Sequence, residues 1–338
     1  MEELNNSELV ISDPKYKNLV LGGGSIKGIS TLGAIQCLMD EKLLDLKKLG
    51  AIAGTSIGSL IALLIVLDFS IEEIWQFILN IDIKKMFQPN PLNFLNFCGA
   101  DNGRRIYDII EDIITKKTGI KHINFKQLYD INKIHLIVVG TCLTTKEVKY
   151  YDYINTPTFK VSMSVRISIG LPGFFMPITI DNKKYIDGGM MNNYPMNLFE
   201  DKLHETIGIQ ICCNYNTEYE WPEEFLMAII NLFMYNYYKK MGQPYPNNTI
   251  TIKDFSDDIT MYNFDITNDT KLKLYQKGID ACKEFIKLIK EHNNNNDGDT
   301  SSIDNKSTVN NKIDTDVTES EICDKNEIVV DDNEENKI

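Results

Sequence analysis

A serine stands between two glycines at residues 54–58, where the sequence reads Gly-Thr-Ser-Ile-Gly. An apolar run that predicts a strand precedes this pentapeptide, and an apolar run that predicts a helix follows it. This context is typical of a nucleophile elbow, a sharp turn that exposes a serine hydroxyl. Ser56 is the candidate nucleophile, and Gly54 and Gly58 are candidates for allowing the tight bend. The alternative is an ordinary strand-to-helix turn in which Ser56 caps the helix.

A serine nucleophile needs a group that accepts its proton. Asp187 lies directly before Gly188 and Gly189, after a polar segment that predicts a hairpin. The two glycines leave its carboxylate uncrowded, so Asp187 is the candidate base, although an aspartate that only caps a hairpin turn is the alternative. A serine–aspartate–histidine triad is a further alternative, because Ser56, Asp187 and His204 follow the chain order of an α/β-hydrolase.

A cluster of glycines at residues 22–28, Gly-Gly-Gly-Ser-Ile-Lys-Gly, follows one predicted strand and opens a predicted helix. It does not match a P-loop, since Lys27 precedes Gly28 instead of following a glycine and preceding Ser or Thr. The spacing of a dinucleotide fingerprint fails as well, because Ile26 and Lys27 stand where glycine is needed. The remaining interpretation is a helix start whose backbone N–H groups bind an anion, such as the oxyanion of an acyl-transfer reaction.

Strands and helices alternate along most of the chain. Alternation of this kind predicts an α/β fold with a mostly parallel sheet and helices on both faces. We expect one domain over residues 16–290, a short N-terminal extension over 1–15 and an acidic disordered tail over 291–338. The predicted strands cover 17–23, 49–56, 133–143, 147–154 and 206–213, and the predicted helices cover 28–44, 57–67, 70–79, 104–119, 226–241 and 270–291.

The acidity of the chain is concentrated in its tail. The net charge is -13, and residues 291–338 supply -10 of it, so the rest is nearly neutral and offers no basic patch for nucleic acid. The first residues do not form a secretory signal, and the longest apolar run is too short to cross a bilayer. The seven cysteines have no CxxC spacing. These features predict a soluble, cytoplasmic protein with free thiols.

Residues 82–103 break the alternation with prolines, asparagines and spaced aromatic residues. Such a segment predicts a cap over the active site or an edge that touches lipid, and an irregular surface connection is the alternative. The apolar side chains expected to insert at a lipid interface are Phe87, Leu92, Phe94, Leu95 and Phe97.

Taken in order, the glycine cluster, Gly-Thr-Ser-Ile-Gly and Asp-Gly-Gly resemble the motifs of the patatin-like phospholipase family. Two further stretches agree: VRISIGLPGFFMPI at residues 165–178, and the Asn-Tyr-Pro that closes DGGMMNNYP. The resemblance covers residues 17–212 and is expected to continue to about residue 290. One departure is Ser25, which stands where the family usually has a third glycine before the basic residue. A positive φ at Ser25 would be strained.

The resemblance implies a three-layer α/β fold and a Ser56–Asp187 dyad that works without histidine, metal or cofactor. It also implies an oxyanion hole of N–H groups at Gly23, Gly24 and Ser25, with Lys27 beside it and in reach of a lipid phosphate. The expected activity is a serine esterase that hydrolyses fatty-acyl esters of phospholipids or lysophospholipids at a membrane or micelle. The alternatives are an acyltransferase and a non-catalytic lipid-binding module on the same scaffold.

Overall fold

The computed structural model describes residues 13–212, 245–253, 255 and 266–297, together with the single positions 225, 228, 229 and 232. Residues 1–293 and 294–338 form two separate compact units. Of the helix predicted at 226–241, the structure describes positions 228, 229 and 232 alone, and all three are helical, whereas the tail from residue 298 onward lies outside the described residues. The domain end predicted at residue 290 falls inside the last helix, which continues to Asp297.

Within the described residues, eight strands form the central sheet, in the order β10-β9-β1-β2-β4-β8-β7, and β5 pairs with β4 beside this path. Five neighbouring strands are parallel, whereas β5 and β8 each run antiparallel to β4. A separate pair of strands, β3 and β6, is parallel. The strands are β1 (Asn18–Leu21), β2 (Ala51–Thr55), β3 (Gly99–Asp101), β4 (His135–Cys142), β5 (Glu147–Tyr151), β6 (Gly173–Phe175), β7 (Ile178–Ile180), β8 (Lys183–Asp187), β9 (Thr206–Ile211) and β10 (Thr249–Ile252).

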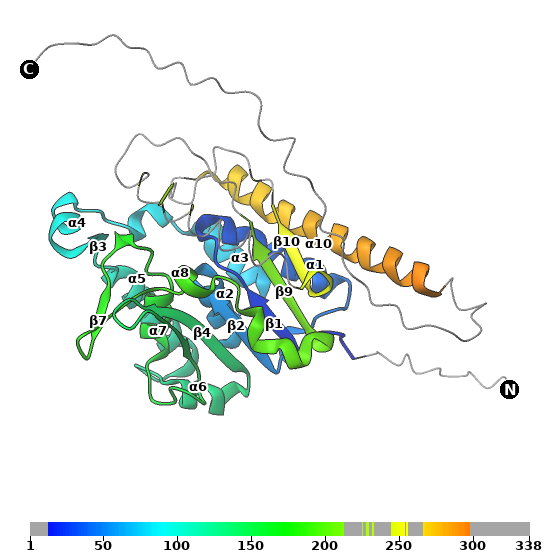
Figure 1. Ribbon diagram of the computed structural model, residues 1–338, viewed down its shortest axis with the longest axis horizontal. Coiled ribbons are helices and arrows are strands. Elements are labelled where there is room, and N and C mark those ends of the chain that lie inside the picture. The colour runs from blue at the N-terminus through cyan, green and yellow to red at the C-terminus, as the bar shows by residue number, and fades with distance from the viewer. Residues whose placement is uncertain are drawn as a thin grey trace, which may run out of the picture. The chain divides into compact units, whose positions relative to one another are not determined.

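Helices connect most of these strands, and α1, α3 and α10 lie together along one side of the sheet (Figure 1). The α-helices are α1 (Ile29–Asp40), α2 (Ile57–Val66), α3 (Ile71–Asn80), α4 (Pro91–Phe97), α5 (Arg104–Thr118), α6 (Phe125–Asn132), α7 (Val161–Ser168), α8 (Gly189–Asn192) and α10 (Asn268–Asp297). The 3-10 helices are η1 (Ser25–Gly28), η2 (Leu46–Lys48), η3 (Ile83–Met86), η4 (Pro195–Glu205) and η5 (Pro246–Asn248).

Alternate residues of the inner strands face two different apolar layers. Leu19 and Leu21 of β1 pack into the large core under the helices, whereas Val20 between them packs with Met196 and Phe199 of η4 on the other face. A period of two is what a strand buried on both faces requires. The predicted three-layer, mostly parallel α/β fold is confirmed, and among the described residues η4 supplies most of the thinner second layer.

Local sequence signals explain where several helices begin and end. The predicted Ser-x-x-Glu start of α3 is a capping box, in which Ser70 and Glu73 each bond the other's backbone N–H. The α5 helix ends at Gly119, whose φ of 72° suits glycine.

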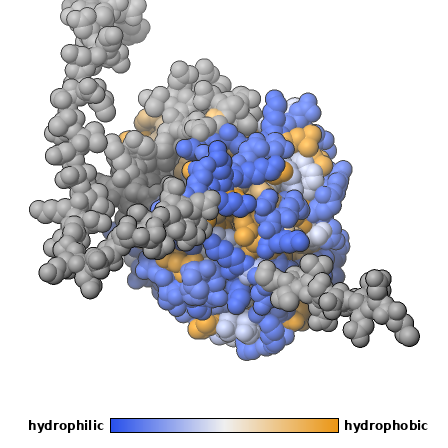
Figure 2. Space-filling model, turned by 90° about the vertical axis from the view of Figure 1, so that its right-hand side faces the viewer, coloured by the Kyte–Doolittle hydropathy of each residue, from blue (hydrophilic) through white to orange (hydrophobic). Residues whose placement is uncertain are grey.

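The opposite side of the molecule from α4, seen in Figure 2, is mainly hydrophilic with small separate apolar patches.

Candidate active site

The turn after β2 has the backbone geometry of a nucleophile elbow. Ser56 stands at its tip with φ 54° and ψ −127°, which costs a non-glycine residue about 1–3 kcal/mol. A Cβ atom at Gly54 would lie 2.4 Å from the carbonyl oxygen of Gly58, and one at Gly58 would lie 2.4 Å from that of Leu21. The two glycines are therefore needed because backbones approach closely here.

The sheet places Asp187 level with this turn. Thr55 of β2 pairs with Val139 of β4, and the next residue of β4, Gly140, pairs with Asp187 at the end of β8. Because β5 occupies one edge of β4 over residues 138–142, β2 and β8 share the other edge and pair with successive parts of it. Ser56 directly follows Thr55, so the serine and the aspartate lie side by side along this edge of β4. The structure thus brings together two residues that are 131 positions apart in the sequence.

Asp187 is a buried carboxyl, with 2% of its surface exposed. Burial raises the pKa of Asp187 to about 7, although hydrogen bonds from the Gly189 N–H and from the Ser56 hydroxyl oppose this rise. The Gly189 nitrogen lies 2.7 Å from Oδ1 of Asp187. A carboxylate with a pKa near neutrality, in contact with a serine hydroxyl, has the properties of a general base.

The glycine loop that follows β1 lies against Ser56. A Cβ atom at Gly23 would lie 3.1 Å from Cβ of Ser56. The N–H of Gly23 donates to the carbonyl oxygen of Asn193 at 3.0 Å. The expectation that Gly23 supplies an N–H to an oxyanion is therefore revised, because this group already has a partner within the protein.

Ser25 has a positive φ, the conformation that was expected to be strained at this position. Its φ is 49°, in the left-handed region that favours glycine. Ser25 and the preceding Gly24 stand at the start of η1, where backbone N–H groups point out of a helix end. The serine therefore keeps the loop shape that a glycine would adopt, at a cost in backbone energy.

Four hydrogen bonds, including the one from the Gly23 N–H, join the motif segments and the stretch at residues 165–178 to one another. Oγ1 of Thr55 donates to the carbonyl oxygen of Asn192 at 2.9 Å, next to the elbow. Nδ2 of Asn193 donates to the carbonyl oxygen of Gly23 at 3.2 Å, which completes a reciprocal pair with the Gly23 N–H. The N–H of Ser56 donates to Oγ of the buried Ser168 at 2.9 Å.

Sequence reasoning gave no role to Ser168, Gly170 or Asn193. The carbonyl oxygen of Gly170 accepts the N–H of Asp187 at 3.0 Å, so α7 and the residues after it contact both members of the Ser56–Asp187 pair. The family-like stretch at 165–178 was the available signal, since it contains Ser168 and Gly170.

Two other candidate residues lie apart from the pair or have a different environment. His204 is exposed and precedes the start of β9, whereas Ser56 follows the end of β2, and these strands run in the same direction within the sheet. The triad alternative therefore lacks the proximity that it needs.

Lys27 is 3% exposed, and its ammonium lies 4.8 Å from the centre of the Phe255 ring, a cation–π contact. Among the described residues, no group of three or more His, Cys, Asp or Glu side chains is arranged to hold a metal.

The fold and the three joined motifs define a protein class, and comparison with known proteins identifies it. The model of the patatin-like phospholipase family matches residues 19–199, and the chain belongs to this family. An uncharacterized protein of Acanthamoeba polyphaga mimivirus is 30% identical over 300 residues, which cover 84% of this chain and 99% of that protein. A probable lipid hydrolase of Invertebrate iridescent virus 6 is 27% identical over 301 residues, covering 87% of this chain and 96% of the relative.

A solved structure has the same fold. The crystal structure of VipD from Legionella pneumophila aligns with 81% of this chain and 67% of its own, with a TM-score of 0.61 and 18% sequence identity. At this identity the likeness concerns the fold alone.

Proposed function

We propose that this protein is a lipid acyl hydrolase that cleaves fatty-acyl esters of phospholipids or lysophospholipids through a Ser56–Asp187 dyad. The observation that carries the proposal is the position of the strained Ser56 directly beside the buried Asp187, whose pKa is raised by burial to about 7. Membership of the patatin-like phospholipase family and the relative named as a probable lipid hydrolase support lipid as the substrate class.

In the proposed first step, Oγ of Ser56 attacks the ester carbonyl while Asp187 takes the hydroxyl proton. The pKa of about 7 leaves a large share of Asp187 ionised at neutral pH and still basic enough to accept this proton. The N–H groups of Gly24 and Ser25 hold the oxyanion, and the positive end of α2 favours charge at Ser56. The protonated Asp187 then gives its proton to the leaving alcohol, which departs as the acyl-enzyme forms.

In the second step, Asp187 removes a proton from water, and the resulting hydroxide attacks the acyl carbon. Collapse of the second tetrahedral intermediate returns the proton to Ser56 and releases the fatty acid. One carboxylate thus serves as base and acid in both halves of the cycle. No histidine takes part in this scheme.

The proposal is tested with the purified protein and a panel of phospholipids and lysophospholipids of defined chains, in excess chelator, with released fatty acids identified by mass spectrometry. We expect free fatty acid and the matching lysolipid or glycerol phosphodiester. An acyltransferase on the same scaffold would instead move the acyl chain to an added alcohol or lysolipid. Binding of lipid vesicles without any acyl product would show a lipid-binding module and contradict the proposal.

A further inference from the structure

The short helix α4 presents two large apolar side chains to solvent. Leu92 is 66% exposed and Phe97 is 57% exposed, while Phe94 between them is half-buried. Phe87, which was predicted to insert into lipid, instead packs against Phe174 and Phe175, with ring centres 5.7 Å from each. The side chain of Leu95, another predicted insertion residue, is outside the described part. We call residues 82–105 and 173–184 the α4 lobe.

The α4 lobe has an internal framework that holds α4 in place. The N–H of Asn90 donates to the carbonyl oxygen of Ala100 at 2.9 Å, and Oδ1 of Asn90 caps the helix at the N–H of Leu92. At its other end, α4 stops at the exposed Cys98, whose φ is 60°. The helix is therefore fixed at both ends, while its Leu92 and Phe97 side chains are exposed.

A buried arginine joins the α4 lobe to the rest of the site. Arg166 of α7 is 1% exposed, and its Nη2 donates to the carbonyl oxygen of Asn102 at 3.0 Å. Its guanidinium lies 4.8 Å from the centre of the Phe175 ring. Burial lowers the pKa of Arg166 to about 10, and the charge of Asp101 opposes this. Since Arg166 lies two residues before Ser168, the lobe and the Ser56 turn are held by one short helix.

The second segment of the α4 lobe, residues 173–184, begins close in sequence to a residue that binds the backbone of Asp187. Gly170, which accepts the N–H of Asp187, lies three residues before β6, and β6 pairs with β3 directly after α4. The segment that contains β6 thus connects the strand beside α4 with the residue that binds the Asp187 backbone. This inference rests on the proposed function for the nature of the ligand.

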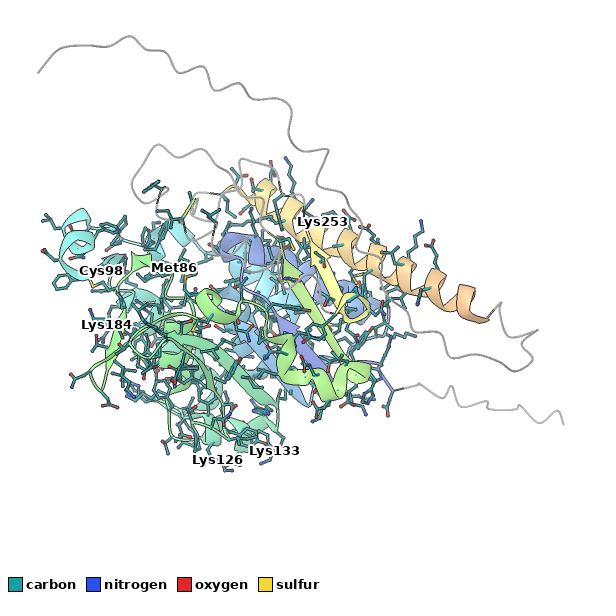
Figure 3. All side chains as sticks on the ribbon, viewed as in Figure 1. Met86, Cys98, Lys126, Lys133, Lys184 and Lys253 are labelled. Atoms are coloured by element: carbon teal, nitrogen blue, oxygen red, sulfur yellow. The ribbon has the colours of Figure 1, made fainter. Side chains whose placement is uncertain are left out.

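The charge of the α4 lobe differs in sign from that of the whole chain. Residues 82–105 and 173–184 hold six lysines and arginines against three aspartates, a net of +3 on a chain of net -13. Arg105, Lys183 and Lys184 are exposed, and Asp101 is buried. Figure 3 shows Met86, Cys98 and Lys184 at one end of the molecule, with Lys126 of α6 and Lys133, directly after α6, away from them. Apolar side chains beside cations match the chemistry of an anionic lipid surface.

We propose that the α4 lobe is the surface by which this protein binds an anionic lipid bilayer, with Leu92 and Phe97 inserted among the acyl chains and the flanking cations at the headgroups. Binding there delivers lipid to Ser56 from the side of β6. A second copy of the chain is the other occupant considered, and the third arm of the test separates it from lipid.

The first arm measures co-sedimentation with vesicles of phosphatidylcholine and phosphatidylserine, in a Ser56→Ala background so that no lipid is consumed. The double variant Leu92→Ser, Phe97→Ser is expected to lower the partition coefficient by at least about tenfold. The matched control is Ile131→Ser, Ile154→Ser, because these side chains are 53% and 61% exposed near α6. Equal binding by the two double variants would overturn the proposal.

The second arm concerns charge. Lys183→Gln with Lys184→Gln is expected to weaken binding to phosphatidylserine vesicles several-fold at low salt and to have little effect on pure phosphatidylcholine. Lys126→Gln with Lys133→Gln, in and directly after α6, is the control for the change in total charge. A loss of binding that is the same for both pairs would show that net charge, and not this surface, governs attraction, and the proposal would fail.

The third arm places a polarity-sensitive dye on Cys98, in a chain with Cys212, Cys213 and Cys323 changed to Ser. Vesicles are expected to shift the dye emission to the blue, whereas a shift that appears with protein concentration alone would indicate a second copy on α4. No shift under either condition would indicate that α4 does not enter lipid, and would overturn the proposal.

The two proposals fail in different ways. Ser56→Ala protein that binds vesicles through α4, together with wild type that hydrolyses no ester, would contradict only the proposed function. Wild type that hydrolyses a soluble short-chain ester while the α4 variants bind vesicles normally would contradict only the role of the α4 lobe.

Discussion

Ser56 and the buried carboxyl of Asp187 lie next to each other along one edge of β4, because β2 and β8 pair with successive parts of that edge. The serine is held in a strained turn, and the aspartate is almost fully removed from water. Both conditions raise the energy of the resting protein. Energetic costs of this kind concentrate at functional sites, where they prepare the reacting groups.

The pH dependence of activity follows from the environment of Asp187. Burial raises the pKa of this carboxyl to about 7, and only the ionised form accepts a proton from Ser56. We expect kcat/KM for a soluble ester to fall about tenfold for each pH unit below 7 and to level off above it. A flat profile between pH 5 and 8 in folded protein would contradict this assignment of the base.

The raised pKa of Asp187 also predicts how the stability of the folded protein changes with pH. Because the pKa of Asp187 is higher in the folded protein than the usual 3.8, the folded state holds the proton more tightly, and its stability falls as the pH rises from about 4 to 7. Asp187→Asn is therefore expected to raise the free energy of unfolding at pH 8 by at most about 4 kcal/mol. The gain should vanish near pH 4, as measured by denaturant unfolding at both pH values.

Backbone strain at Ser56 is testable without any substrate. Ser56→Gly is expected to be more stable than Ser56→Ala by about 1–3 kcal/mol, because glycine adopts φ 54°, ψ −127° without a Cβ clash. Denaturant unfolding of the two inactive variants measures the difference. Should alanine prove the more stable residue, the turn would not have the geometry of an elbow.

Ser25 offers a related test beside the proposed oxyanion hole. Since its φ is 49°, Ser25→Gly is expected to raise the free energy of unfolding by about 1 kcal/mol. Esterase activity should stay within about twofold, because the backbone N–H donors remain. Lys42→Gly is the matched control, since Lys42 is exposed with φ 58° far from the motif segments in sequence. A large loss of activity in Ser25→Gly alone would assign a role to the serine hydroxyl.

Asn193 is expected to position the glycine loop. Its Nδ2 donates to the carbonyl oxygen of Gly23, so Asn193→Ala should lower kcat about tenfold or more while the protein stays folded. The neighbouring Asn192→Ala is the control, because the Asn192 side chain bonds Tyr150 and Asn197 instead. Similar activities for the two variants would argue against this role.

Much of the site could be predicted from local sequence, because a nucleophile elbow and an Asp-Gly-Gly turn are short-range features. Gly54, Ser56 and Gly58 fall on a strand–turn–helix junction that apolar periodicity already indicates. The capping box of α3 is likewise a four-residue signal. The predicted family and fold class are confirmed by the family match and by the sheet order.

Features that depend on long-range packing could not be predicted in this way. Ser168 accepts a hydrogen bond from Ser56, 112 residues away, and nothing in its local sequence distinguishes it from a serine at a helix end. Arg166 is charged, and charged residues are almost never fully buried unless they are paired. Residues 82–103, for which an irregular surface connection was one of the alternatives, contain a helix and a strand, because β3 is stabilised by pairing with the distant β6.

Fatty-acid release by wild type and three single variants tests the central claim most directly. With a soluble ester and with phospholipid, Ser56→Ala and Asp187→Asn should each lower the rate on the order of 10³-fold or more. His204→Ala, on an exposed residue at the other end of the strands, should keep activity within about twofold. Full activity in folded Asp187→Asn, or a collapse in folded His204→Ala, would contradict a Ser56–Asp187 dyad.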